Sequence, residues 1–207
     1  KEQEEVIKKI EFNKSKTHLL YGVTGSGKTE VYMHLIEKVI KTNKTAIMLV
    51  PEISLTTQIV NRFYKRFGNN VAVFHSGLSK GERHDEYKKI YSGDVKIVVG
   101  TRSAIFTPMK NIGIIIIDEE HSTSYKQDNN PRYNAIDIAI KRSEYHNCPL
   151  LLGSATPTLE AFARGLKGVY KLLVMTKRAT NAPLPKIHII DMKAGEIKTT
   201  VPAELIQ

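Results

Sequence analysis

The chain has 207 residues, 41% hydrophobic and 25% charged, a balance that excludes a disordered chain and an integral membrane protein. Lysine and arginine total 31 against 21 acidic residues, so the net charge of +10 favours a polyanionic partner, nucleic acid first. The single cysteine, Cys148, excludes an internal disulfide and a cysteine-based zinc cluster within these residues, and it fits a reducing, cytoplasmic compartment. The charged start is not a secretory signal, and no apolar run approaches the roughly 20 residues that span a bilayer, so no membrane partner is expected.

Strand-like and helix-like segments alternate along the chain. An amphipathic helix is predicted over residues 2–11, where Val6, Ile7 and Ile10 share one face. The other predicted helices cover residues 28–41, a segment after Ser54 that Ser54 could cap, 79–91 and 133–145. The predicted strands lie at 18–22, 45–50, 71–75, 95–100, within 111–121, at the start of 149–158, and at 169–175.

Four consecutive isoleucines, Ile114 to Ile117, form the strongest strand signal. Both faces of such a strand must be covered, as in a parallel sheet between layers of helices. We therefore predict an α/β fold with a mostly parallel sheet and helices on both faces, whose chemistry lies where strands open into loops. Residues 1–176 are assigned to this domain and residues 177–207 to a linker, with an edge strand at 186–191.

A glycine-rich segment, HLLYGVTGSGKT at residues 18–29, matches the pattern G-x-x-x-x-G-K-[ST] through Gly22, Gly27, Lys28 and Thr29. Such glycines let backbone N–H groups point at phosphate oxygens, and the following helix N-terminus adds positive charge. Lys28 could reach the β and γ phosphates, while the Thr29 hydroxyl could ligate Mg²⁺. The alternative is a glycine turn that binds nothing. The pattern predicts an ATP site formed by Gly22, Thr24, Gly25, Ser26, Gly27, Lys28 and Thr29.

Two acids, Asp118 and Glu119, directly follow the isoleucine strand. A strand end places both carboxylates at the edge of the sheet, where Mg²⁺ of a bound nucleotide would lie. Asp118 is the candidate to hold Mg²⁺ through water, and Glu119 is the candidate base for the attacking water. The alternative is a pair of solvated acids at a strand end.

The order GVTGSGKT, then DEEH at residues 118–121, then Ser154-Ala155-Thr156 is that of superfamily 2 helicases. Five further segments, VPEISLT, HSGLS, GTRSAIFTP, DEEHSTSYKQ and GSATPTLE, together resemble the PriA family (primosomal protein N-prime) of bacterial replication-restart helicases. The resemblance runs from Gln3 to about Lys193. It implies the first of two RecA-like motor lobes, with ATP and Mg²⁺ as cofactors, and a catalytic group formed by Lys28, Asp118, Glu119 and His121.

The resemblance also implies residue roles around the nucleotide and the DNA. Gln3 would read adenine, or would be a plain surface amide. Ser154 and Thr156 would couple hydrolysis to strand movement and could join His121 in a network, or would form a polar turn. The segments that would grip a single-strand backbone contain Pro51, Ser54, Thr56, Thr101 and Arg102. A helix cap for Ser54 and a surface cation for Arg102 are the alternatives.

The segment 124–135, SYKQDNNPRYNA, interleaves aromatic and cationic residues, which suits base stacking with phosphate contact. The resemblance implies a loop that senses DNA and signals to the ATP site; the alternative is an ordinary surface loop. Its candidate residues are Tyr125, Lys126, Gln127, Arg132 and Tyr133. The chain has Asn134 and Ile136 where the family is expected to have histidine and arginine, which removes any contact that depended on their charge.

The implied function is ATP-driven 3′-to-5′ unwinding of single-stranded or forked DNA, with single-strand binding protein and helicase-loading proteins as partners. We find no second glycine-rich segment after residue 177, no zinc-binding cysteines and no winged helix, so we expect an isolated first lobe with weak nucleotide binding and little hydrolysis. The alternatives are a docking module with a degenerate nucleotide site, or another superfamily 2 motor.

Overall fold

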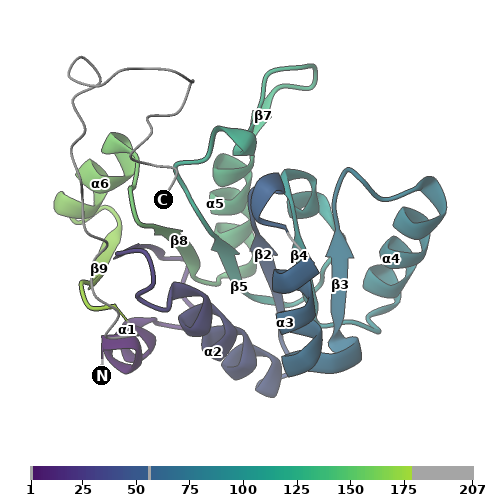
Figure 1. Ribbon diagram of the computed structural model, residues 1–207, viewed down its shortest axis with the longest axis horizontal. Coiled ribbons are helices and arrows are strands. Elements are labelled where there is room, and N and C mark those ends of the chain that lie inside the picture. Colours follow the sequence, from purple (N-terminus) through teal and green to yellow (C-terminus); the bar gives the residue numbers. More distant parts are fainter. Residues whose placement is uncertain (1, 56, 179–207) are drawn as a thin grey trace, which may run out of the picture.

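Seven parallel strands form the central sheet of the computed structural model, which describes residues 2–55 and 57–178 (Figure 1). The strands are β1 (Thr17–Gly22), β2 (Thr45–Leu49), β3 (Val71–Phe74), β4 (Ile97–Gly100), β5 (Ile112–Ile117), β8 (Leu150–Ser154) and β9 (Lys171–Met175). They lie in the order β3-β4-β2-β5-β8-β1-β9, and every neighbouring pair is parallel. The predicted α/β fold is therefore confirmed.

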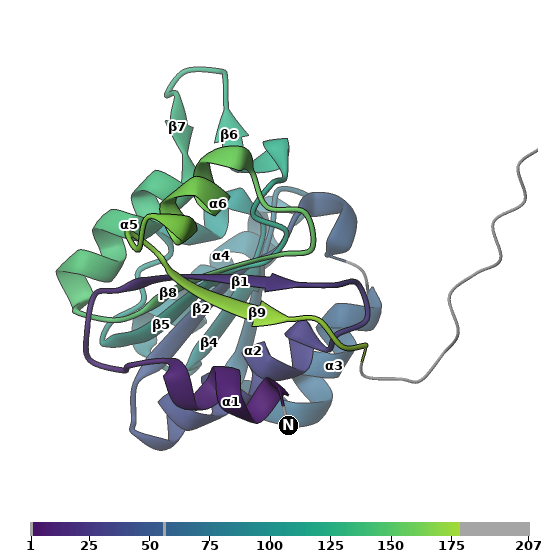
Figure 2. The same cartoon turned by 90° about the vertical axis from the view of Figure 1, so that its left-hand side faces the viewer.

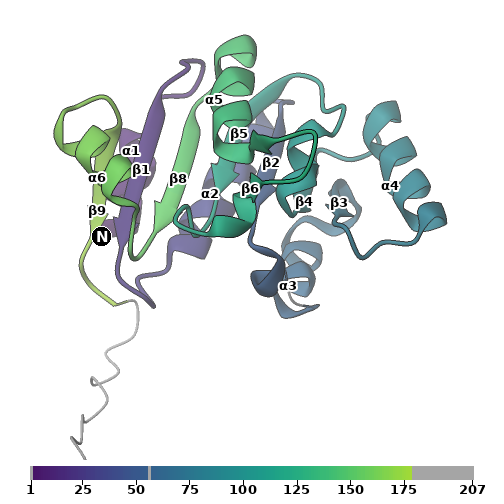
Figure 3. The ribbon, with the colours of Figure 1, turned by 90° about the horizontal axis from the view of Figure 1, so that it is seen from above.

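Helices cover both faces of this sheet (Figure 2). On one face lie α1 (Glu2–Lys9), α2 (Lys28–Lys41) and α3 (Thr57–Phe67), and on the other lie α5 (Ala135–His146) and α6 (Leu159–Leu166). Helix α4 (Lys80–Ser92) flanks the edge strand β3 (Figure 3). Within the described residues, no helix is both long enough and apolar enough to cross a bilayer.

The isoleucine strand β5 joins the two halves of the core. Ile114 and Ile116 pack into the cluster beneath α1, α2 and α3, whereas Ile115 and Ile117 pack into the cluster beneath α5 and α6. Successive side chains of a strand point to opposite faces, so all four isoleucines are buried. This confirms the prediction that both faces of β5 are covered.

Short 3₁₀ turns follow strands at the carboxyl edge of the sheet, where the predicted site lies: η1 (Glu52–Ser54) after β2, η3 (Arg102–Phe106) after β4 and η4 (Thr123–Tyr125) after β5. Another, η2 (Gly68–Asn70), leads from α3 into β3. A two-stranded antiparallel hairpin, β6 (Lys126–Gln127) with β7 (Tyr133–Asn134), projects from the body of the domain (Figure 1). No pattern in the sequence predicts this hairpin, because each of its strands is only two residues long.

Three boundary predictions need comment. Ser54 does not cap α3: the chain first makes the turn η1, closed by the bond from Ser54 N–H to Pro51 O (2.9 Å), and the helix begins only at Thr57. The last strand of the sheet covers Lys171–Met175 only, shorter than predicted. Thr56, the edge strand proposed at 186–191 and all but the first two residues of the proposed linker lie outside the described residues.

Candidate nucleotide and nucleic-acid site

The phosphate loop connects the end of β1 to the start of α2. Gly25 and Gly27 have φ angles of 78° and 87°, in the left-handed region that favours glycine, and Gly27 is the N-cap of α2. A Cβ on Gly22 would lie 2.9 Å from Ser26 Oγ. The loop can close this tightly only because glycine occupies these positions.

Two polar contacts hold the loop. Lys28 is largely buried, and its ammonium group donates a hydrogen bond to Gly22 O at 2.8 Å. Gln3, on α1, donates from Nε2 to Ser26 O at 3.2 Å. Gln3 is therefore attached to the phosphate loop and is more than a solvated amide, while its reading of adenine stays a prediction.

The carboxyl ends of β1 and β5 meet at one pocket of about 320 Å³. Its lining includes Thr24, Gly25, Gly27, Lys28 and Thr29 from the phosphate loop, Asp118 and Glu119 directly after β5, and Glu30 and Arg62. The structure thus brings most of the predicted phosphate-binding residues, though not Gly22 or Ser26, to one pocket with the predicted acid pair, although β8 separates their strands in the sheet.

The donor set of this pocket fits a magnesium nucleotide. Lys28 and the N-terminus of α2 supply the donors for phosphate, whereas Ser26 Oγ is buried without a hydrogen-bond partner among the described residues and does not line the pocket. Thr29 and Asp118 could hold Mg²⁺, which commonly takes one or two protein ligands and completes its shell with waters and phosphates. A metal ion with so few protein ligands suits this pocket, because no group of three or more His, Cys, Asp or Glu side chains converges within residues 2–55 and 57–178.

Two buried tyrosines hold Asp118. The Tyr32 hydroxyl donates to Asp118 Oδ1 at 2.9 Å, and the Tyr125 hydroxyl donates to the Asp118 main-chain oxygen at 2.5 Å. Burial raises the pKa of Asp118, the Tyr32 hydrogen bond opposes that shift, and the neighbouring charge of Glu119 adds to it. A cation in the pocket would offset both burial and repulsion.

Glu119 has a strained backbone, with a φ of 48° in the left-handed region that side chains other than glycine rarely adopt. Such a conformation costs about 1 to 3 kcal/mol and persists where the surroundings impose it. Here both neighbours are tied to strands: Asp118 N–H donates to Leu49 O and Glu120 N–H donates to Gly153 O, each at 2.9 Å. The strain lies at the residue predicted to act as the base.

His121 lies at the centre of a polar cluster, as the sequence analysis anticipated. Its Nδ1 is 2.8 Å from Ser154 Oγ, 3.5 Å from Thr156 Oγ1 and 3.5 Å from a carboxylate oxygen of Glu119. Ser154 Oγ also accepts from Thr156 N–H at 3.0 Å. The arrangement connects the acid pair to the loop that follows β8.

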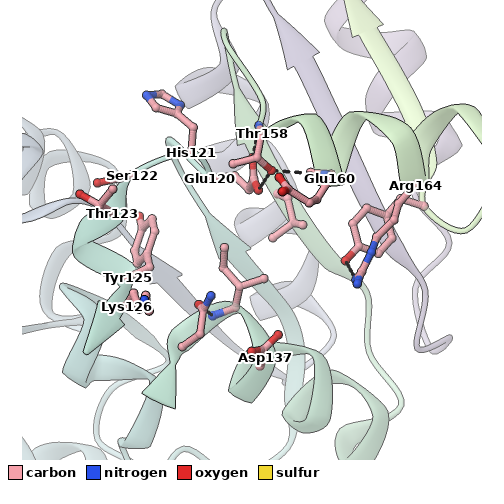
Figure 4. Close-up of a pocket in the computed structure, with 15 residues that line it drawn as sticks. Glu120, His121, Ser122, Thr123, Tyr125, Lys126, Asp137, Thr158, Glu160 and Arg164 are labelled. Atoms are coloured by element: carbon pink, nitrogen blue, oxygen red, sulfur yellow. Dashed lines mark hydrogen bonds between the residues drawn. The ribbon is translucent and has the colours of Figure 1, made fainter. Parts of the chain in front are cut away.

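Glu120, the third acid of the DEEH segment, has a role that the sequence analysis missed. Its carboxylate is buried and accepts from Thr158 N–H at 3.1 Å and from Thr158 Oγ1 at 2.7 Å (Figure 4). Thr158 in turn caps α6 by accepting from Ala161 N–H. Glu120 therefore joins the acid segment to α6, at the wall of a second pocket of about 320 Å³.

Burial changes the interpretation of three predicted DNA-contacting residues. Tyr125 is 1% exposed, and its hydroxyl is engaged by Asp118, so the prediction that its ring stacks on a base is wrong. The position of Tyr125 instead allows it to act on the predicted ATP site through Asp118. Pro51 and Thr101 are buried as well, so they shape their segments and cannot present side chains to a strand.

Arg102 links two of the predicted DNA segments. Its guanidinium donates to Ser124 O at 3.2 Å and to Lys126 O at 2.7 Å, and lies 5.7 Å from the centre of the Tyr133 ring. That half-buried ring also packs edge-on against Phe106, with ring centres 5.0 Å apart. Arg102 is thus a structural anchor rather than a free surface cation.

The projecting hairpin carries the exposed polar residues of this region. Lys126 and Arg132 are exposed, and Gln127 Nε2 donates to Pro131 O across the turn at 2.9 Å. Asn134 and Ile136, which stand where histidine and arginine are expected in the family, have local roles in the structure: Asn134 Oδ1 caps α5 by accepting from Ile136 N–H at 2.9 Å, and Ile136 packs against the core.

Arg62 is the other residue that the sequence analysis missed. It comes from α3, is half exposed, and lines the nucleotide pocket with a nitrogen 3.9 Å from a Glu30 oxygen. Arg66, one turn later, is instead bonded to both Glu30 and Glu37. No motif marks Arg62, because its position depends on how α3 packs beside α2.

The chain is similar in sequence to known helicases. Residues 1–164 match the DEAD/DEAH box helicase family. The chain is 56% identical over 190 residues to the replication restart protein PriA of Bacillus subtilis (strain 168), covering 92% of this chain and 24% of that protein. It is 49% identical over 181 residues to PriA of a Synechocystis strain, covering 85% of this chain and 22% of that protein.

Solved structures show the same RecA-like fold. RecG bound to a three-way DNA junction matches with a TM-score of 0.62 at 23% identity, covering 86% of this chain and 24% of that chain. The Pyrococcus furiosus Hef helicase domain matches with a TM-score of 0.60 at 21% identity, covering 84% and 37%. The chain therefore belongs to the DEAD/DEAH box helicase family, and the predicted resemblance to the replication restart protein PriA is confirmed.

Proposed function

We propose that this chain is the ATP-binding motor lobe of a replication-restart DNA helicase that moves 3′ to 5′. The observation that supports this most directly is the shared pocket of Lys28, Thr29, Asp118 and Glu119. The names of the relatives support the replication-restart assignment. Single-strand binding protein and helicase-loading proteins are its proposed partners, by family resemblance.

The residues divide the chemistry among them. Lys28 and the loop amides would bind the phosphates, and Thr29 with Asp118 would hold Mg²⁺, which neutralises phosphate charge when bound. Glu119 would accept a proton from the attacking water, and its distance of 3.5 Å from His121 lets the Ser154 loop respond to that change of charge. The exposed Lys126 and Arg132 would contact the DNA backbone without reading sequence.

The test compares substitutions in the whole protein. Lys28→Ala should abolish ATP binding and turnover, whereas Glu119→Gln should abolish turnover and retain binding. Lys38→Ala, an exposed cation on the same helix, is the matched control and should change neither. Turnover retained in Lys28→Ala or Glu119→Gln would refute the assigned role.

The 207-residue chain by itself should bind nucleotide weakly and hydrolyse it little. Motors of this type need an arginine finger from outside the nucleotide lobe, which contributes about 10³ to 10⁵ in rate. Strong salt-dependent binding of DNA with no nucleotide binding would favour a docking module instead. Side-by-side binding of single-stranded DNA and RNA would separate a DNA motor from an RNA helicase.

A further inference from the structure

Tyr32 lies one turn beyond the phosphate loop, on the helix that begins at Lys28. Its side chain is completely buried, and its hydroxyl donates to Asp118 Oδ1 at 2.9 Å. Asp118 is 8% exposed and also lines the nucleotide pocket. One carboxylate thus contacts both a buried phenol and the space where Mg²⁺ would be held.

The far side of the Tyr32 hydroxyl is closed by Gly153, on β8. A Cβ on Gly153 would lie 1.8 Å from the hydroxyl oxygen and 2.8 Å from the adjoining ring carbon, so only glycine leaves room for the phenol. Gly153 O also accepts from Glu120 N–H. The hydroxyl is therefore confined between the ends of β5 and β8.

Packing alone does not explain why residue 32 carries a hydroxyl. A phenylalanine ring would fill the same apolar space, and a buried hydroxyl is unfavourable unless it is bonded. An ordinary phenol is protonated at neutral pH, so the Tyr32 hydroxyl is the donor in its bond to the Asp118 carboxylate. A fixed donor at Oδ1 restricts the rotation of the Asp118 carboxyl group.

We propose that Tyr32 is a positioning residue for magnesium binding, which holds the Asp118 carboxylate toward Thr29 and the nucleotide pocket. The inference rests on the proposed function. Partners that orient a metal-binding carboxylate typically affect metal affinity by about 10- to 100-fold when they are removed. Because Gly153 confines the hydroxyl, the phenol has one position, and its hydrogen bond then gives the carboxylate one orientation.

The test measures binding of a fluorescently labelled ADP to the 207-residue chain, in EDTA and at rising Mg²⁺ concentration. Tyr32→Phe should raise the Mg²⁺ concentration needed for half-maximal tightening by about 10- to 100-fold and leave binding in EDTA unchanged. Tyr170→Phe, which removes from a buried tyrosine the hydroxyl that accepts from Arg164, is the matched control and should not change the Mg²⁺ response.

An unchanged Mg²⁺ response in Tyr32→Phe, or an equal loss of binding in EDTA, would overturn the role of Tyr32 while the proposed function stands. No binding by the unaltered chain in either buffer would overturn the proposed function and this role with it. Gly153→Ala provides a second route: it should weaken the Mg²⁺ response when Tyr32 is present and have a smaller effect in the Tyr32→Phe background, where the 1.8 Å contact with the hydroxyl is gone and only the ring carbon at 2.8 Å must shift. If the losses of Mg²⁺ response caused by Gly153→Ala and by Tyr32→Phe add up in the double variant, the inference is wrong.

Discussion

The buried carboxylate of Glu120 offers a test of how the acid segment is held in place. Glu120→Gln keeps the shape of the side chain and one acceptor oxygen, but it replaces the other oxygen with an NH₂ group. Glu120 accepts two hydrogen bonds from Thr158, one from N–H and one from Oγ1. Glutamine can still accept from Thr158 N–H and can donate its NH₂ to Thr158 Oγ1, but this leaves the hydroxyl proton without its acceptor and removes the negative charge from both bonds.

A hydrogen bond to a charged group contributes about 1.5 to 3 kcal/mol. For a domain of this size, 1 kcal/mol corresponds to a shift of about 2 to 4 °C in the unfolding midpoint. We expect Glu120→Gln to lower the midpoint by about 3 to 12 °C. Because Glu120 does not line the nucleotide pocket, the affinity for nucleotide should be unchanged.

The assay is thermal unfolding followed by far-ultraviolet circular dichroism. Glu160→Gln removes the same charge from an exposed position on α6 and serves as the matched control, with an expected shift of at most about 2 °C. If Glu120→Gln shifts the midpoint no more than Glu160→Gln does, then the bonds to Thr158 do not stabilise the domain. A loss of nucleotide affinity in the stably folded variant would show that Glu120 acts in the pocket itself.

Three further outcomes are expected. Arg62→Ala should weaken binding of labelled ADP by about two- to fivefold without changing the unfolding midpoint. Arg66→Ala should lower the midpoint without changing ADP binding, since Arg66 bonds Glu30 and Glu37. Equal effects of the two substitutions on ADP binding and on the midpoint would contradict this division. Glu119→Asn should raise stability by about 0.5 to 1 kcal/mol in urea unfolding, because asparagine tolerates the left-handed backbone, and it should also abolish turnover. A lower stability would show that the strain is not released. Burial lowers the pKa of His18 from 6.5 to about 4, so between these pH values the unfolded chain binds more protons than the folded one, and stability should fall as pH falls from about 6.5 to 4. In urea unfolding, His18→Leu should flatten this dependence of the midpoint on pH. An unchanged dependence would exclude His18 as its source.

Local patterns predicted much of the fold. The runs around Ile114 to Ile117 and at residues 45–50 determine buried strands, because apolar side chains on both faces require cover on both faces. The phosphate loop could be located because its glycines and Lys28 act within one short segment. The meeting of Lys28 and Asp118 could be expected as well, since parallel strands open their carboxyl ends at one edge.

Only the tertiary structure decided the surroundings of the acids. Tyr32 and Asp118 are 86 residues apart in sequence and Glu120 and Thr158 are 38 apart, and no periodicity reports such contacts. The interleaved aromatic pattern at residues 124–135 predicted a stacking role for Tyr125, but that ring is buried in the core cluster beneath α5 and α6. The sequence determined which groups could perform phosphate chemistry; the packing of α2, β5 and β8 determined which of them are held together, because burial and hydrogen-bond geometry arise only when distant segments meet.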